Sequence, residues 1–166
     1  MRIVFTIEGA AEFDRNLATL PGRCQKSVFR TATRAAQEPL KRRVQLNARA
    51  LPYSARSLYA VKEDDVRMSE LIAASIHIVP PKRQKASSYA MQVQIDNRPE
   101  FFHKTEAGRE YWIPWAIEYG HGSTKEAAAR PYMRPAVDTT IEETKRILAN
   151  ELGAGILREV IKGRYK

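Results

Sequence analysis

Cysteine and long apolar runs are the features that this 166-residue chain has least of. Cys24 is its only cysteine, which excludes an intramolecular disulfide framework and a zinc site built from cysteines alone. One thiol also fits a reducing cytoplasm. No apolar run approaches the roughly 20 residues that a membrane span needs, and the first nine residues lack the longer apolar stretch of a secretory signal. We therefore predict neither a membrane partner nor export by that route.

Signals for catalysis are equally sparse. The three histidines, His77, His103 and His121, are scattered, and none forms the close pair typical of a metal site. The Gly-His-Gly-Ser run at residues 120–123 lacks the lysine and the preceding strand of a phosphate-binding loop. Cys24 would need a nearby histidine to act as a nucleophile, and a lone thiol is more often inert. We predict that the chain is not an enzyme, and we assign it no catalytic residue, cofactor or metal.

Positive charge, in contrast, is concentrated in one segment. The net charge is +9, and residues 21–50 alone hold eight basic residues against one acidic residue, Glu38. A negatively charged partner would meet this segment first, although a solvated helix face explains the same pattern. Five of the cations repeat at helical spacing and form a predicted basic stripe, which consists of Arg23, Lys26, Arg30, Arg34 and Lys41.

The longest helical pattern runs from about Arg23 to Leu51. Pro39 interrupts it, because an interior proline lacks an N–H group and clashes with the preceding turn, so we expect a kink or break near residues 36–38. Apolar side chains that predict the buried side of this helix recur at every fourth position, at Val28, Ala32, Ala36, Leu40, Val44 and Ala48.

Between this helix and the C-terminal region, the pattern predicts two strands separated by loops. Residues 52–70 are polar and rich in turn-forming residues, and we expect a loop excursion there. The apolar run at 71–79 and the alternating run at 89–95 are predicted strands that pair antiparallel. Residues 96–114 are polar with little periodicity, which indicates a second loop excursion.

The two ends of the chain carry simpler patterns. Residues 2–8 predict a short strand, and residues 10–20 predict a short helix. The last helix is predicted to start near Pro135, because proline suits the first turn of a helix. No sharp compositional boundary divides the chain, so we predict one domain over residues 1–166.

Two motifs near the C-terminus are more specific. Residues 117–120 read Ile-Glu-Tyr-Gly and end an aromatic stretch, and residues 129–136 read Ala-Arg-Pro-Tyr-Met-Arg-Pro-Ala. Taken singly, each of these residues is explained by core packing or by a turn. Taken together, and with the long Ala- and Arg-rich helix before them, they resemble the tail-completion and neck protein family of long-tailed bacteriophages, which includes minor tail protein Z-like proteins.

The resemblance implies an α+β fold, in which a small antiparallel sheet is packed by the long helix and the C-terminal helix. It also implies that the aromatic stretch ending at residues 117–120 is a strand or turn. It also implies a structural virion protein, assembled in the host cytoplasm, that forms a ring at the head–tail junction or tail end and is needed for tail completion and head–tail joining. The implied partners are further copies of the chain, with a hexamer favoured, the head connector, and the tail tube or tail terminator; phage DNA would make at most a passing contact. No catalytic residue comes with the family. The motif residues implied for the interface are Trp115, Glu118, Tyr119, Gly120, Pro131, Tyr132, Met133, Arg134 and Pro135.

Aromatic residues are the candidate anchors of such a ring, because they are enriched at interface centres. Core packing is the alternative role for each of them. Within the motif, we expect Arg134 to hydrogen-bond the Glu118 carboxylate as a structural staple. The candidate anchors are Trp112, Trp115, Tyr119 and Tyr132.

The basic stripe leaves a second function open. The stripe would contact an acidic neighbouring ring or DNA. We favour the protein neighbour, because a channel through which DNA slides should not bind the DNA tightly. The alternative is a basic nucleic-acid-binding protein that uses the helix at 23–49. No zinc-finger, helix-turn-helix or RNA-motif signature accompanies that helix.

Overall fold

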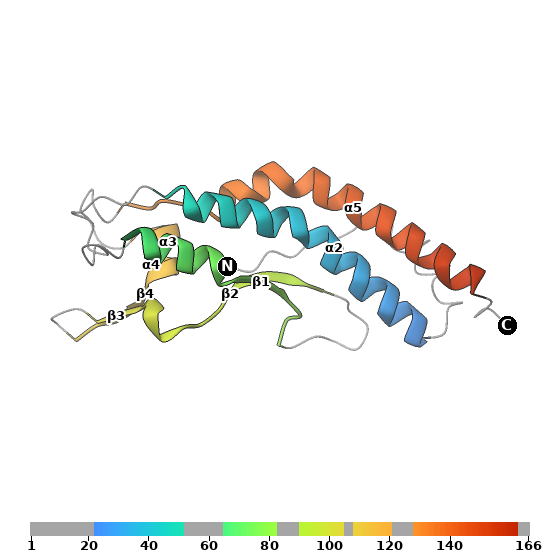
Figure 1. Cartoon of the computed structure of the whole chain (residues 1–166), viewed down its shortest axis with the longest axis horizontal. Helices are drawn as coiled ribbons and strands as arrows, with labels where there is room; N and C mark the ends of the chain where they lie inside the picture. The colour runs from blue at the N-terminus through green and yellow to red at the C-terminus, as the bar shows by residue number, and fades with distance from the viewer. Residues whose placement is uncertain (1–21, 52–64, 83–89, 105–107, 121–127, 163–166) are drawn as a thin grey trace. The chain divides into compact units, whose positions relative to one another are not determined.

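The computed structural model describes residues 22–51, 65–82, 90–104, 108–120 and 128–162 (Figure 1). These residues form helices together with two sheets of two antiparallel strands each, so the predicted α+β class is confirmed. The strand predicted at 2–8 and the helix predicted at 10–20 lie outside the described residues. In the described part of the chain, no helix is long and apolar enough to cross a membrane.

The chain divides into two compact units, each built from segments that are far apart in the sequence. The described residues of unit 1 are 22–39, 78–82, 90–93 and 141–162, and all other described residues belong to unit 2. Both long helices contribute to both units. The division therefore does not follow chain order, and the single domain over residues 1–166 stays a prediction.

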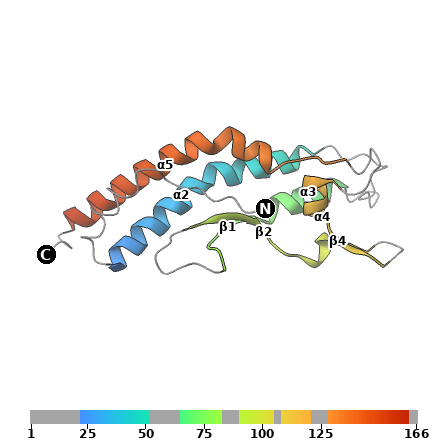
Figure 2. The same cartoon turned by 180° about the vertical axis from the view of Figure 1, so that it is seen from behind.

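Two long helices form the core of unit 1. Helix α2 spans Gly22–Arg49, and helix α5 spans Arg134–Ile161. Within unit 1 they lie side by side in both views (Figures 1 and 2). Small residues on the contact surface allow this close approach, and a Cβ atom placed on Gly155 would lie 2.6 Å from Cγ1 of Val28. The buried members of this core are Val28, Ala32, Ala36, Leu148 and Leu152.

Helix α2 continues through Pro39, so a break near residues 36–38 is wrong, and the kink expected there as the alternative stays a prediction. Proline removes one N–H donor from the helix interior, which leaves the carbonyl of Ala35 without its usual partner. Burial on both sides of the proline offsets this loss, because Ala36 and Leu40 are 2% and 1% exposed. The boundary between the two units falls immediately after Pro39.

In unit 2, helix α3 spans Asp65–Ala74, where the sequence had indicated other structures. The predicted loop at 52–70 is wrong for residues 65–70, and its remainder lies outside the described residues. The predicted strand at 71–79 is wrong for residues 71–75, because a short apolar run suits a buried helix as well as a strand. Ser75 ends the helix, with its hydroxyl donating to the carbonyl of Leu71 at 2.7 Å.

The first sheet pairs β1 (Ile76–Val79) with β2 (Gln92–Ile95), as the sequence predicted. Val93 and Ile95 are buried and alternate with half-buried glutamines, because successive side chains of a strand point to opposite faces. The strand predicted at 89–95 begins only at Gln92, and Tyr89 lies outside the described residues.

The second sheet corrects the loop excursion predicted at 96–114. After a short 3₁₀ turn at Pro99–Phe101, β3 (Phe102–Lys104) pairs with β4 (Glu110–Trp112), and His103 lies opposite Tyr111. The strands are three residues long and largely exposed, so they leave no apolar alternation in the sequence. Phe101, which precedes β3, is fully buried in unit 2.

Candidate functional site

Helix α4 (Ile113–Tyr119) carries the first of the two C-terminal motifs, and all of the site built on it lies in unit 2. The strand or turn expected here is therefore a helix. Pro114 occupies its first turn, where the missing N–H group costs nothing. Gly120 ends the helix at a φ of 77°, a backbone region that favours glycine.

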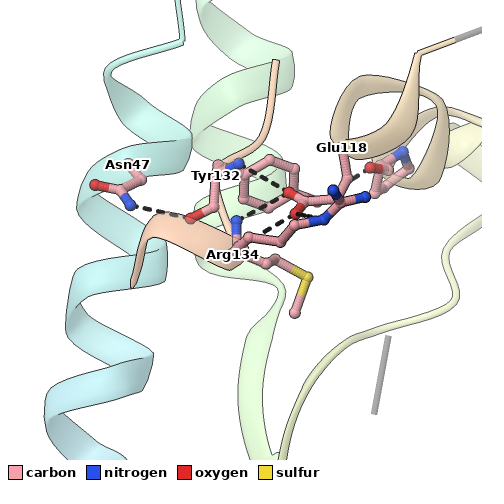
Figure 3. A network of polar contacts seen from close by, with 6 residues as sticks. Asn47, Glu118, Tyr132 and Arg134 are labelled. Carbon is pink, nitrogen blue, oxygen red and sulfur yellow. Dashed lines mark hydrogen bonds and ion pairs between the residues drawn. The ribbon is translucent and has the colours of Figure 1, made fainter. Parts of the chain in front are cut away.

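Glu118 projects from α4 into the start of α5, and its side chain is 2% exposed. One carboxylate oxygen, Oε2, accepts hydrogen bonds from the backbone N–H groups of Tyr132 at 2.8 Å and Met133 at 2.9 Å. The other oxygen, Oε1, accepts from the backbone N–H of Arg134 at 3.2 Å (Figure 3). We call Glu118 and these three backbone groups the Glu118 clamp.

The Glu118 clamp satisfies donors that the start of a helix otherwise leaves unpaired. Arg134 is the first residue of α5, and the first N–H groups of a helix have no partner within it. Pro135 follows and has no N–H group to satisfy. The N–H of Val137 then donates to the carbonyl of Met133 at 3.1 Å. A negative charge is also favourable at this positive end of the helix dipole.

The side chain of Arg134 makes a weaker contact with Glu118 than the sequence predicted. Its Nε atom lies 3.7 Å from Oε1 of Glu118, so the two form an ion pair rather than a bidentate hydrogen-bonded pair. The guanidinium carbon lies 4.5 Å from the centre of the Tyr119 ring, within the range of a cation–π contact. The hydrogen bonds to Glu118 come from the backbone.

Further contacts tie the two motifs together. The N–H of Arg130 donates to the carbonyl of Ile117 at 2.8 Å. The hydroxyl of Tyr132 donates to the carbonyl of Pro114 at 3.3 Å. Residues 117–120 and 129–136, which are separate in the sequence, thus form one local structure.

Asn47, on α2, supports the same structure from a third element. Its side-chain amide donates to the carbonyl of Tyr132 at 3.0 Å (Figure 3). Sequence reasoning missed this residue. The sequence held one signal for it. Asn47 directly precedes Ala48, which belongs to the predicted buried side of the long helix.

Burial divides the predicted motif residues into two groups. Glu118, Tyr132 and Met133 are buried, so the suggestion that Tyr132 is a surface anchor is wrong. Pro131, Arg134 and Pro135 are exposed, while Gly120 and the candidate anchor Trp112 are half-buried. The remaining two aromatic candidates, Trp115 and Tyr119, are 53% and 36% exposed.

Three of the exposed or half-exposed side chains meet at one place. The rings of Trp115 and Tyr119 have their centres 5.1 Å apart, and Arg134 lies over the Tyr119 ring. Aromatic residues and arginine are the types that dominate the binding energy of many protein interfaces. We call Trp115, Tyr119 and Arg134 the aromatic–arginine patch.

The basic stripe on α2 is only partly exposed. Lys26, Arg30 and Arg34 are exposed, and each lies two residues before a buried core residue, which is about 200° around the helix axis. Lys41 shares this side of the helix with Arg30 and Arg34, but it is half-buried. Arg23 belongs to α2, but its side chain lies outside the described residues.

The histidines and other titratable groups in the described residues are dispersed. His77 pairs with Asp96 at 3.1 Å, and the ring of His103 lies 5.1 Å from that of Tyr111. Burial raises the pKa of the Tyr111 phenol above its ordinary value. The described part of the chain holds no group of three or more histidine, cysteine or acidic residues placed to bind a metal ion. His121 lies outside the described residues.

Comparisons of the chain with protein-family models, with curated proteins and with solved structures found no match.

Proposed function

We propose that this protein is a structural component of a phage virion that forms a ring at the head–tail junction or tail end. In this role it completes the tail and joins it to the head. Its neighbours are further copies of itself, the head connector, and the tail tube or tail terminator. A hexamer is favoured because such tails have six-fold symmetry.

The Glu118 clamp is the observation that carries the proposal. The resemblance to the phage family rests on two motifs, and their most distinctive residues make direct contact: Glu118 of the first binds the backbone of Tyr132, Met133 and Arg134 of the second. A shared local structure gives a physical reason for these residue types to occur together. This supports reading the two motifs as one unit.

The aromatic–arginine patch is the proposed contact surface within the ring. A closed ring needs a surface on each copy that binds a different surface on the next copy. Trp115 has more than half of its surface free, and the arginine beside it adds directional hydrogen-bond donors. The clamp holds both on the joined ends of α4 and α5, so little order has to be gained on binding.

Complementation of a phage that lacks this gene tests the proposal. The double variant Trp115→Ala/Tyr119→Ala should fold but fail to restore infectious particles, because both side chains are exposed and truncating them removes interface contacts rather than core. Leu157→Ala is a matched control, since it truncates a side chain that is 62% exposed and belongs to unit 1, whereas the patch belongs to unit 2. Full complementation by the double variant would reject this surface.

A further inference from the structure

Lys26, Arg30 and Arg34 form an outward-facing row of cations on α2 in unit 1. They are spaced four residues apart, so the row covers about 12 Å of the helix. Within the described residues, none of the three forms an ion pair or a hydrogen bond through its side chain. We call this row the α2 cation row.

The charges on the neighbouring helix of unit 1 are arranged differently. In α5, Lys145 pairs with Glu142 at 2.8 Å, and Arg158 pairs with Glu151 at 3.7 Å. The next residue after the helix, Lys162, pairs with Glu159 at 3.3 Å. Lys145 and Arg158 are thus paired with acids on the same helix, and Lys162 with an acid just before it. Arg146 of α5 and the three cations of the α2 cation row have no acid partner within the described residues. Unbalanced positive charge at a surface attracts an external anion.

The side chains beside the row match one class of anion. Ser27 and Thr31 are exposed next to these cations, and hydroxyl groups join lysine and arginine in contacts with nucleic-acid phosphates. No aromatic side chain among the described residues of α2 is exposed, so this face offers no platform on which unpaired bases could stack. Cations and hydroxyls without aromatics suit the backbone of a duplex rather than a single strand.

A second copy of this chain is a poorer occupant. Three acids of its α5, namely Glu142, Glu151 and Glu159, already have partners of their own, which leaves only Asp138 and Glu143 as exposed acids without a partner on the described α5. Displacing those partners would cost the contacts that they make. A duplex instead presents one negative charge for about every 1.7 Å of its axis.

We propose that the α2 cation row binds the phosphate backbone of duplex DNA without sequence preference. The three side chains contact phosphates, and binding is accompanied by the release of counterions from the DNA. This proposal replaces the protein neighbour that the sequence favoured for the basic stripe. It concerns a surface other than the aromatic–arginine patch, and it does not depend on ring formation.

The test measures binding of a fluorescent DNA duplex by the whole protein at several salt concentrations. Three phosphate contacts predict a slope of about −2.7 for the logarithm of affinity against the logarithm of salt concentration, which is roughly a 40-fold loss between 50 and 200 mM salt. The triple variant Lys26→Gln/Arg30→Gln/Arg34→Gln should lose most of the affinity and most of this slope. Glutamine has a good helix propensity, so α2 should remain folded, which circular dichroism checks.

A matched control separates the cation row from net charge. The variant Lys145→Gln/Arg158→Gln/Lys162→Gln also removes three positive charges from unit 1, but from residues that have acidic partners. It should keep at least half of the affinity and the full salt slope.

The proposal would be overturned by equal weakening in both triple variants, by binding that does not depend on salt, or by no binding at low salt. A change of oligomeric state in the α2 variant, with DNA binding intact, would assign the row to a protein neighbour instead. The phage complementation test is unaffected by any of these results, so the two proposals fail separately.

Discussion

Removing the Glu118 carboxylate should destabilise the protein far more than removing its arginine partner. In the Glu118→Ala variant, the backbone N–H groups of Tyr132, Met133 and Arg134 lose their acceptor. Each buried donor left unpaired costs about 1–3 kcal/mol. Allowing for water at the exposed Arg134, we expect a loss of about 3–5 kcal/mol in the free energy of unfolding, which is also the range for breaking a buried charged contact.

The Arg134→Gln variant removes the ion pair with Glu118 and the cation–π contact with Tyr119, while the carboxylate stays in place. The Arg134 side chain is 51% exposed and its contact with Glu118 is 3.7 Å long, so the loss of the ion pair should cost at most about 1 kcal/mol and that of the cation–π contact about 0.5–1 kcal/mol. The expected loss in the free energy of unfolding for Glu118→Gln lies between those of the other two variants, at about 1–3 kcal/mol. Its single amide oxygen can still accept two of the three N–H groups, but its NH₂ group then faces Arg134.

Urea unfolding followed by circular dichroism gives the order of these losses. At about 2–4 °C for each kcal/mol, Glu118→Ala should lower the melting temperature by roughly 6–20 °C. Glu143→Gln, which changes an exposed carboxylate on α5, is the control and should stay within about 0.5 kcal/mol of the parent protein. If Glu118→Ala costs no more than Arg134→Gln, then the carboxylate does not serve as the cap of α5, and this reasoning is refuted.

Two further predictions concern helix contact and ionisation. Gly155→Ala should cost about 1–3 kcal/mol in urea unfolding, because the new methyl group would lie 2.6 Å from Val28, and the cost should shrink in a Val28→Ala background. Gly153→Ala, with open space around it, should instead stabilise the helix by up to about 1 kcal/mol; a loss there would contradict the contact assignment. Tyr111 should ionise above pH 10.0, as measured by the difference between alkaline ultraviolet titrations of the parent and of Tyr111→Phe. Because folding raises the pKa of this phenol, its contribution to stability is complete below pH 10.0 and is lost as the pH rises through the folded-state pKa; a difference curve centred at or below 10.0 would be inconsistent with its burial.

The sequence predicted those parts of the fold in which apolar residues recur at a regular spacing along one side of a helix or strand. The buried stripe of α2 extends from Val28 to Ala48 and outweighs the single contrary signal of Pro39. Strand β2 was found because its alternation is clear. Helix α3 was missed because the run from Leu71 to Val79 contains the end of a helix and a strand in direct succession, and no turn residue separates them.

The candidate site was only partly predictable for a different reason. Pattern and spacing drew attention to Glu118 and Arg134, but they could not say that the carboxylate binds backbone groups rather than the guanidinium. The sequence also did not determine which aromatic side chains are exposed. Tyr132 and Trp115 were both candidate anchors, but Tyr132 is buried and Trp115 is 53% exposed. Asn47 joins the site from 85 residues away along the chain, a distance that local periodicity does not span.

The central claim is the proposal that this chain is a phage head–tail component. Its most direct test is to delete the gene from the genome that carries it and to image the resulting lysate by negative-stain electron microscopy. The proposed role predicts filled heads that lie apart from finished or abnormal tails, with joined particles restored when the gene is supplied in trans. Complete and normally joined particles in the deletion lysate would contradict a role at the head–tail junction or tail end.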